Sequence, residues 1–504
     1  MSEPVRVPVL IAGGGVTGLS AAVFLAHFGV PSLLAERRPA PLAEPRARSL
    51  NPPTVELYRA VGLERAIRAV RSPVADHTVV AHAESVAGPE RVRLPDRSTA
   101  GGPGQWVPID QDQLESVLRD HAGGADVRYG TEVVAVEQAA DGVFATLRSA
   151  AGDVRVRAGH LVVADGARGA LRDLLGIGHS GPGTIARKLN VHFEADLAGP
   201  LRGRRVVALT VANPAVRGFL TSVDGARRWR FAISLEPGQV AADFPRERCA
   251  ELVRAAVGAD GVPIAVERVA DATWDIAGRV ADRMRVDRVL VAGDAAHTMP
   301  PVGSFGVATG VQDAFNLAWK LGLVHGGVAG EELMATYEAE RLPVAWATTK
   351  LCVERYRVLN GGPGDAAGNG ARRGRLMFEC AYPDGAFVPD PDHPRSTRVA
   401  QASTGDLLGG WALLTGAFAR GWDDAAARAV VPVTCRPAPG PLVAEGVPPD
   451  GAVLLRPDGF AAWRGTDPGS LHAALDRVLC REVDGREVGA PAASAEDVVG
   501  APAG

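Results

Sequence analysis

The stretch that decides the fold is "VPVLIAGGGVTGLSAAVFLAHFGVPSLLAERRP", residues 7–39. The continuous apolar run Val7–Ala12 is typical of a parallel strand that is covered on both faces. Helical patterning over Leu19–Phe28 follows, and Gly29 is a helix stop signal. Ser32–Glu36 then reads as a second short strand. The stretch therefore predicts a β-α-β unit.

Three glycines lie at the junction of the first strand and the helix. Gly13, Gly15 and Gly18 form G-x-G-x-x-G, in which the first allows a tight turn, the second lets a pyrophosphate approach and the third lets the helix pack on the strand. Glu36 ends the second strand, where a carboxylate accepts hydrogen bonds from a ribose diol. An ordinary glycine turn is the alternative, but strand, helix, second strand and terminal acid together favour a dinucleotide site.

The composition narrows the class of protein. The chain has 504 residues, 46% hydrophobic and 22% charged, with a net charge of −4, so we expect several domains and no nucleic-acid face. The five cysteines are scattered without a C-x-x-C, which argues against a zinc or dithiol site and predicts no bound metal. We find no signal-peptide pattern and no apolar run long enough for a bilayer. We expect a cytoplasmic protein that binds neither nucleic acid nor membrane.

A second informative stretch is "VLVAGDAAHTMPPVG", residues 289–303. An expected strand over 288–292 leads to Asp294, and prolines and glycines precede a helix expected to begin near Gly310. A carboxylate beside free helix N–H groups suits a reduced flavin, with ribityl hydroxyls at Asp294 and the N1/O2 edge at the helix start. Alternatively, Asp294 caps the following turn. Asp165 and Gly166 also follow an apolar strand, but alone they indicate only a common Asp-Gly turn.

The rest of the chain suggests how the domains are arranged. Long helices are expected over 310–327 and 330–351, a glycine-rich linker over 360–374, and a disordered tail over 489–504. Together with the family resemblance given in the next paragraph, they imply a first FAD-domain part (1–176, with substrate-domain strands near 73–108), a substrate-binding sheet (177–274), a second FAD-domain part with long helices (275–393) and a small C-terminal α/β domain (394–504).

Taken in order, these motifs resemble the flavoprotein aromatic hydroxylases, the group A monooxygenases with the p-hydroxybenzoate hydroxylase fold. The resemblance runs from about Val7 to Pro343 and includes "PRARSLNPPTVELYRAVGL", "PIDQDQLESVL" and "GDAAHTMPPVGSFGVATGVQDAFNLAWKL". The most similar subgroup hydroxylates phenols and aromatic polyketides and carries a C-terminal thioredoxin-like domain without C-x-x-C. The resemblance implies an α/β fold: a Rossmann-like FAD domain of the GR2 type, interleaved with a mostly antiparallel substrate sheet.

The resemblance also assigns site residues. Arg37 would lie beside the adenosine, Arg46 and Gln111 would reach the pyrophosphate and ribityl chain, and Pro301 would lie by the flavin and the oxygen site. Pro301 and Arg46 are the catalytic candidates, and no side-chain base is identified. The implied cofactor-binding set is Gly13, Gly15, Val16, Thr17, Gly18, Glu36, Arg37, Arg46, Gln111, Val133, Asp165, Gly166, Asp294, Pro301, Gly306, Val307 and Ala308.

Two positions depart from the family pattern. Ala308 stands where the family often has Asn, and Gly169 stands where Ser is frequent.

The reaction that the resemblance implies uses NADPH or NADH to reduce FAD, and O2 then forms a C4a-hydroperoxide that a phenol ring attacks. The protein's part is positioning, exclusion of water and proton control.

Substrate contacts are less clear from the sequence. Trp229, Phe231 and His192 lie in the expected substrate sheet, and strand alternation places Trp229 and Phe231 on the face opposite Arg230. Each aromatic could line a pocket, although packing in the sheet core is the favoured alternative. His297 is interpreted as structural, because the motif places it under the turn.

The leading hypothesis is an FAD- and NAD(P)H-dependent monooxygenase, acting as a monomer or homodimer on a small phenolic or polyketide-type aromatic. A Baeyer–Villiger or epoxidising oxygenase on the same scaffold is one alternative. A non-redox FAD-binding protein that stabilises a pathway intermediate is the other, and the two departures at Ala308 and Gly169 favour it slightly.

Overall fold

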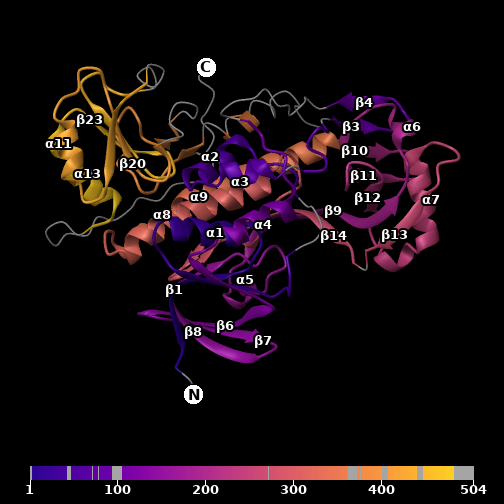
Figure 1. The fold of residues 1–504 in the computed structure, drawn as a ribbon, viewed down its shortest axis with the longest axis horizontal. Helices are drawn as coiled ribbons and strands as arrows, with labels where there is room; N and C mark the ends of the chain where they lie inside the picture. Colours follow the sequence, from indigo (N-terminus) through magenta and orange to yellow (C-terminus); the bar gives the residue numbers. More distant parts are fainter. Residues whose placement is uncertain are drawn as a thin grey trace.

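The computed structural model describes residues 3–41, 47–70, 72–77, 79–93, 105–270, 272–360, 372–374, 376–377, 380–399, 407–439 and 446–481. Arg46, most of the glycine-rich segment and the C-terminal tail therefore lie outside the described residues. The described residues fold around two large sheets and two small ones (Figure 1).

The first sheet has eight strands and contains the predicted β-α-β unit. Its main path runs β15-β16-β8-β1-β2-β5, and β1 pairs in parallel with both β2 and β8. Strands β6 and β7 extend it as an antiparallel hairpin against β8. The strands are β1 (Val5–Ala12), β2 (Ser32–Glu36), β5 (Ala125–Tyr129), β6 (Thr131–Ala139), β7 (Gly142–Ser149), β8 (Gly152–Val163), β15 (Arg285–Val286) and β16 (Val289–Val291).

Helices cover this sheet because its central strands are apolar on both faces. Val9, Leu10 and Ile11 of β1 are all fully buried. Helices α1 and α8 pack against each other above the strands, with α9 alongside α8 (Figure 1). The helices of this part are α1 (Val16–His27), α2 (Pro52–Ala60), α3 (Glu64–Ala69), α4 (Gln111–Asp120), α5 (Leu171–Leu174), α8 (Phe305–His325) and α9 (Ala335–Leu359), and the 3₁₀ turns are η2 (Gly293–Ala295) and η3 (Glu331–Met334).

The second sheet has nine strands and is antiparallel except where β10 pairs with β3. Its order is β17-β14-β9-β12-β11-β10-β3-β4, with β13 on β9, and α7 covers its apolar face. The strands are β3 (Val79–Ala83), β4 (Glu90–Arg93), β9 (His179–Glu194), β10 (Val206–Ala212), β11 (Arg217–Ser222), β12 (Arg228–Leu235), β13 (Ala265–Val269), β14 (Trp274–Ala281) and β17 (His297–Thr298). The helices are α6 (Ala198–Leu201), η1 (Ala241–Asp243) and α7 (Arg246–Val257).

The C-terminal part forms a four-stranded mixed sheet in the order β21-β20-β22-β23. Strands β20 and β21 are parallel and the other pairs are antiparallel, which is the arrangement expected of the thioredoxin-like domain. Its elements are β20 (Trp411–Thr415), α11 (Trp422–Ala427), β21 (Val433–Pro437), β22 (Ala452–Leu455), β23 (Ala461–Gly465), η5 (Pro468–Ser470) and α13 (Leu471–Val478), and the short pair β18 (Ala381–Tyr382) and β19 (Ser396–Thr397) precedes them.

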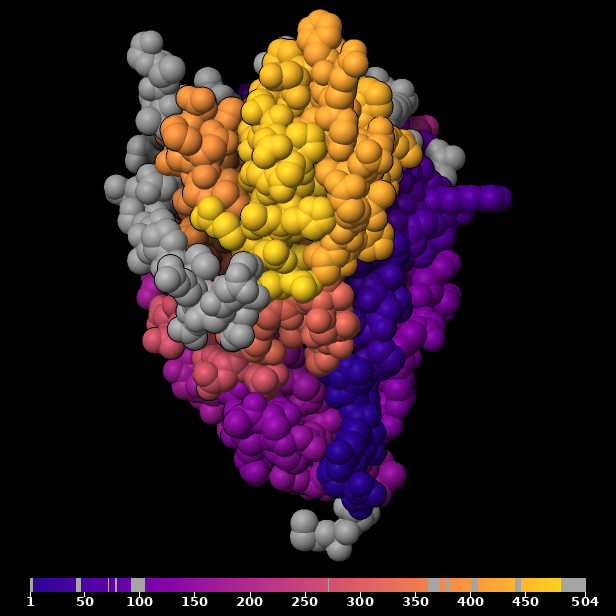
Figure 2. All heavy atoms as spheres, turned by 90° about the vertical axis from the view of Figure 1, so that its left-hand side faces the viewer, coloured from indigo at the N-terminus to yellow at the C-terminus, as the bar shows by residue number. Residues whose placement is uncertain are grey.

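This C-terminal part packs on the far side of the long helices from the nine-stranded sheet (Figure 1). Figure 2 shows its yellow elements lying on the coral part of the chain that includes α8. Trp411 of β20 meets Trp319 of α8 edge to face, with ring centroids 5.8 Å apart. No helix within the described ranges could span a bilayer, since none is both long and apolar enough.

Candidate functional site

The glycine turn after β1 is as tight as the motif predicts. Gly13 has a φ of +109°, and a Cβ added there would lie 2.3 Å from the carbonyl oxygen of Ala164. A Cβ on Gly18 would lie 1.9 Å from the Gly13 carbonyl oxygen, so the helix touches the turn. A Cβ on Gly15, by contrast, would meet only the Glu115 Oε1, at 3.9 Å. The turn is closed on the protein side and open at the first residues of α1, where N–H groups attract an anion.

Glu36 is bound to the same turn. Its Oε2 accepts a hydrogen bond from the Gly14 N–H at 2.6 Å, and its Oε1 accepts from the Arg38 N–H and Nε–H. Burial raises the pKa of Glu36, but the hydrogen bonds from Arg38 and Gly14 outweigh burial and leave the pKa lowered. A carboxylate has about four acceptor sites, so Glu36 has room for about one more donor, such as a ribose hydroxyl.

Asp165 follows β8 at the same edge of the sheet. Its Oδ2 accepts from the Leu171 N–H at 3.1 Å, while its Oδ1 is buried and has no hydrogen-bond partner among the described residues. Burial is the main cause that raises the pKa of Asp165. A Cβ on Gly169 would lie 1.9–2.1 Å from this carboxyl group. The glycine at position 169 therefore makes room for Asp165.

The turn after β16 lies against the glycine turn. A Cβ on Gly293 would meet Thr17 Oγ1 at 2.3 Å, and a Cβ on Gly310 would meet the same atom at 2.5 Å. Asp294 lies in η2 with its side chain exposed. Helix α1, η2 and α8 thus converge through small residues, and the Asp294 carboxylate lies at their surface.

Helix α8 begins at Phe305, five residues before the predicted start near Gly310. Gly306, Val307 and Ala308 are therefore its first turn and not the loop before it. Ser304 precedes the helix with a φ of +58° and gives no side-chain cap to it. The first N–H groups of α8 lie before its internal hydrogen bonds, which begin with the Ala308 N–H donating to the Ser304 carbonyl oxygen at 3.4 Å.

The remaining cofactor candidates lie around these turns. Arg37 is exposed at the end of β2, Gln111 is the first residue of α4, and Val133 is buried in β6. Gly166 has a φ of +83° and Pro301 is exposed just before α8. Gly13 adjoins Asp165, and Thr17 of α1 adjoins Gly293 and Gly310. The charge of Arg37 acts on Asp165 and opposes the rise in the pKa of that carboxyl group that burial causes.

The two aromatic substrate candidates, Trp229 and Phe231, are buried in the core of their sheet. Both lie under α7, and the Trp229 Nε1–H donates to the Ala195 carbonyl. Their packing is the alternative that the sequence favoured. His192 lies on the opposite face, across from Arg230. We name this opposite side the polar face, defined by Lys188, Asn190, His192, Arg230 and Ser234.

An apolar cluster lies beside the start of α8. Phe305 packs there with Leu351 and Cys352 of α9. The Cys352 Sγ–H points to the Val302 carbonyl oxygen at 3.8 Å, so the cluster also touches the segment that carries Pro301. Its other members are Met377, Trp106, Met299 and Leu376.

The sequence did not reveal what anchors the Asp294 turn. Asp313 of α8 accepts from the Gly293 N–H at 3.1 Å, and its Oδ2 lies 2.7 Å from His297 Nε2. Arg341 of α9 donates from Nε to Asp313 Oδ1 at 2.8 Å, and all three side chains are buried. His297 therefore has the structural role predicted for it.

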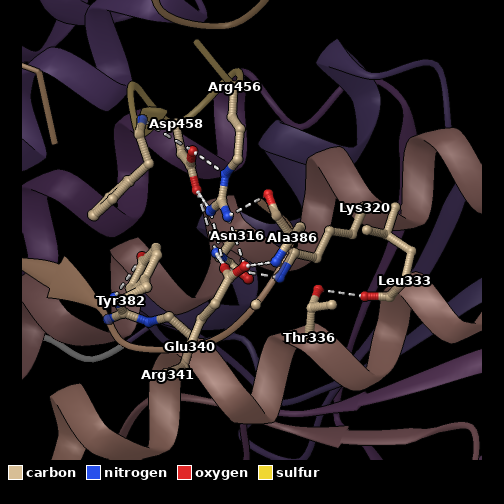
Figure 3. A network of polar contacts seen from close by, with 12 residues as sticks. Asn316, Lys320, Leu333, Thr336, Glu340, Arg341, Tyr382, Ala386, Arg456 and Asp458 are labelled. Carbon is tan, nitrogen blue, oxygen red and sulfur yellow. Dashed lines mark hydrogen bonds and ion pairs between the residues drawn. The ribbon is translucent and has the colours of Figure 1, made fainter. Parts of the chain in front are cut away.

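A second buried polar network joins the C-terminal part to the long helices (Figure 3). Glu340 of α9 accepts from both Arg456 Nη atoms, at 2.6 and 2.9 Å, and from Lys320 Nζ at 2.9 Å. Asp458 accepts from Arg456 and Asn316. None of these residues was singled out from the sequence, because their partners are far apart along the chain.

The open glycine turn, the buried Asp165 oxygen and the uncapped start of α8 are typical of a dinucleotide-binding protein. Comparison with known proteins makes the class specific. Residues 6–351 match the FAD binding domain family, and residues 383–481 match the aromatic-ring hydroxylase C-terminal domain. The chain belongs to this family of FAD-dependent aromatic hydroxylases.

Individual relatives of this chain are also hydroxylases or monooxygenases by name. Tetracenomycin B2 monooxygenase-dioxygenase of Streptomyces olivaceus is 36% identical, with 95% of this chain and 99% of that protein covered. Aklavinone 12-hydroxylase of Streptomyces purpurascens is also 36% identical, with the same shares covered. The crystal structure of aklavinone-11 hydroxylase with FAD and aklavinone superposes with a TM-score of 0.85 at 31% identity, covering 95% of this chain and 100% of that one.

Proposed function

We propose that this enzyme uses NADPH or NADH and O2 to hydroxylate a phenolic or polycyclic aromatic polyketide-type substrate. The observation that carries the proposal is the start of α8. Its uncapped N–H groups lie next to the Asp294 turn on one side and to the apolar cluster around Phe305 on the other. This arrangement offers donors for a flavin ring edge and an apolar wall for an aromatic ring.

The residues present fit an FAD. The first turn of α1 would hold the pyrophosphate, Glu36 the adenosine ribose, and Asp165 the adjoining part of the cofactor. Asp294 would bind a ribityl hydroxyl, and the N–H groups of Gly306 and Val307 would face the pyrimidine edge, with Ala308 beside them. When bound, the flavin supplies the electron transfer and oxygen activation that no side chain provides.

The substrate would lie between the apolar cluster and the polar face of the nine-stranded sheet. Ring surface would pack on Phe305 and its neighbours, and ring oxygens would face Lys188, Asn190 and Arg230. Pro301, exposed before α8, would border the reacting position. The complex of aklavinone-11 hydroxylase with FAD and aklavinone supports a substrate of this class.

Anaerobic reduction tests the proposal. NADPH is added to the FAD-loaded enzyme without and with a polycyclic phenol, and the flavin absorbance is followed. We expect slow bleaching alone and much faster bleaching with the phenol, because aromatic binding triggers reduction in this class of hydroxylase. A flavin that no nicotinamide reduces, with any aromatic tried, would favour the non-redox alternative.

The structure of the product distinguishes ring hydroxylation from Baeyer–Villiger oxygenation or epoxidation. Admission of ¹⁸O₂ should give a product with one labelled oxygen as a new ring hydroxyl. A product in which the label lies within a ring, as an ester or epoxide, would contradict hydroxylation and favour the Baeyer–Villiger or epoxidising alternative.

A further inference from the structure

Arg48, in the segment between β2 and α2, is a buried cation without hydrogen bonds. Its side chain is only 9% exposed. Nε, Nη1 and Nη2 are each buried, and in the described part of the chain none has a hydrogen-bond partner. Its ion-pair partner is the Asp110 carboxylate, 3.9 Å from Nη1, which is beyond hydrogen-bond reach. Five N–H donors are therefore left for something else.

The other buried arginines of the site show how unusual this is. Arg341 donates to Asp313, Thr309 and Tyr382, and Arg456 donates to Glu340, Asp458 and Ala386. A buried guanidinium is tolerated when its donors are met, and it is costly when they are not. Burial lowers the pKa of Arg48, while Asp110 and Asp112 oppose this, and a guanidinium stays charged at neutral pH. Within the described residues, Arg48 is therefore a charged guanidinium whose N–H groups meet no acceptor.

The backbone around Arg48 is fixed on three sides. Ala47 and Gln111 exchange hydrogen bonds, so one side is tied to the start of α4. Ser49 Oγ lies 3.0 Å from Ser304 Oγ, directly before α8. Leu50 pairs with Val107 through two backbone hydrogen bonds. The backbone that carries the Arg48 side chain is thus fixed by its neighbours, which limits the ordering needed when a ligand binds.

Arg48 lies at the border of the proposed flavin and substrate positions. Through Ser49 it adjoins the start of α8. Through Asp110 it adjoins the polar face, because the Asp110 carboxylate feels the charges of both Arg48 and Arg230. The charged and titratable groups within electrostatic range of the Arg48–Asp110 pair are Asp112, His77 and Arg230.

We infer that Arg48 binds the ionised ring oxygen of the phenolic substrate and so favours the phenolate. This assignment rests on the proposed function. The guanidinium stays charged and can aim two of its N–H groups at one phenolate oxygen, so that each contact is a charge-assisted hydrogen bond. A phenolate ring is richer in electrons than a phenol ring, so the same contact would both orient the substrate and prepare its ring for oxygen transfer.

The test compares Arg48→Gln and Arg48→Lys with the unchanged enzyme, each loaded with FAD. Arg119→Gln is the matched control, because Arg119 is 38% exposed in the last turn of α4 and pairs with Asp120. The probe is 2-hydroxyanthraquinone, whose ionised form absorbs at longer wavelength. Its affinity and the pH at which the bound probe ionises are read from difference spectra, and FAD affinity and the KM for NADPH are measured in parallel.

We expect the bound probe to ionise at lower pH than the free probe, and this shift to vanish in Arg48→Gln. Probe affinity should fall about 10- to 100-fold in Arg48→Gln, as for loss of charged hydrogen bonds, and less in Arg48→Lys. FAD affinity should not change.

Three results would overturn the assignment. If Arg48→Gln keeps the probe affinity and ionisation while the unchanged enzyme hydroxylates, Arg48 does not bind the oxyanion and the proposed function stands. If only FAD affinity or the KM for NADPH changes, the guanidinium serves a cofactor. If the unchanged enzyme holds FAD but neither binds nor oxygenates any phenol, the assignment and the proposed function both fail.

Discussion

His297 Nε2 lies 2.7 Å from Asp313 Oδ2, and both side chains are fully buried. The same carboxylate holds the Gly293 N–H and the Arg341 guanidinium. One side chain of α8 thereby fixes the turn that carries Asp294 against both long helices. The position of the exposed Asp294 carboxylate therefore depends on a residue 19 positions further along the chain.

Replacing Asp313 by Asn should destabilise the protein and weaken FAD binding. The change leaves the Arg341 charge buried without its carboxylate, which costs about 3–5 kcal/mol. Urea unfolding and FAD titration measure the two effects. Asp173→Asn, at a side chain that is 76% exposed, is the control and should change neither. Equal stability of Asp313→Asn and the unchanged enzyme would contradict the anchoring role.

The charges around Asp313 should also make the stability of the protein depend on pH in the acid range. Burial raises the pKa of Asp313, but the charges of Arg341 and His297 outweigh burial and lower it overall. A lowered folded pKa means that the stabilisation is present above the unfolded pKa and is lost as pH falls through the folded one. Stability of the unchanged enzyme should therefore fall on acidification more steeply than that of Asp313→Asn. Parallel pH curves for the two proteins would argue against this linkage.

Gly169→Ala should weaken FAD binding. An added Cβ would lie within about 2 Å of the Asp165 carboxyl group, so Asp165 must move. Loss of a charged hydrogen bond to the cofactor would raise the FAD dissociation constant about 10- to 100-fold. Gly199→Ala is the control, because a Cβ there meets nothing within 4 Å. Unchanged FAD affinity in Gly169→Ala would remove Asp165 from the cofactor site.

Lys188 should make stability rise at alkaline pH. Burial, with a smaller effect of Arg217, lowers the pKa of Lys188 from 10.5 to about 8. The folded protein then binds fewer protons than the unfolded chain between these values, so stability rises with pH across that window, by up to roughly 3 kcal/mol. Lys188→Met should flatten the rise and add stability near pH 7.

The control for this variant is Lys350→Met, because Lys350 is exposed at its place in α9. Unfolding free energies of the three proteins are compared from pH 7 to the alkaline end of the window. If Lys188→Met retains the full rise, another group causes it, and Lys188 is not the buried cation of the polar face.

The sequence predicted the parts of the site that are local in the chain. The glycine turn and Glu36 lie within one β-α-β unit, and the strand before Asp294 was legible from its apolar run. The start of α8 was placed five residues too late, because Gly303 and Gly306 look like loop, whereas Gly306 already lies in the first turn of the helix.

The buried ion pairs that hold the Asp294 turn and the C-terminal part could not be predicted, because their partners are far apart in the sequence. Arg341 follows Asp313 by 28 residues and Arg456 follows Glu340 by 116, and no local period links them. Arg48 was part of a quoted family segment, but its burial and its unmet donors are properties of three-dimensional packing. For Trp229 and Phe231, strand alternation correctly placed both side chains on one face of the sheet. It could not tell that this face is the one covered by α7.

Arg456 should tie the C-terminal part to the long helices. It is fully buried, binds Glu340 with both Nη atoms, and lies over the ring of Trp319 at 5.1 Å. Removing it would leave two carboxylates, Glu340 and Asp458, with the single buried cation Lys320 of this network. Breaking such a buried pair costs about 3–5 kcal/mol. Arg456→Met should therefore lower the unfolding temperature and expose the C-terminal part to proteolysis.

Met fills much of the space of the Arg456 side chain but carries no charge, so the variant tests the loss of charge more than the loss of volume. Arg420→Met, at an exposed position of the same C-terminal part, is the control for the introduced side chain. Limited proteolysis followed by mass spectrometry should show earlier cuts between the long helices and β20 in Arg456→Met only. Combining Arg456→Met with Glu340→Gln should recover part of the loss, because the partner charge is removed as well. If the double variant is as unstable as the sum of the single ones, the two residues do not act as a pair, and the joint between the C-terminal part and α8 rests on apolar contacts such as Trp319 with Trp411.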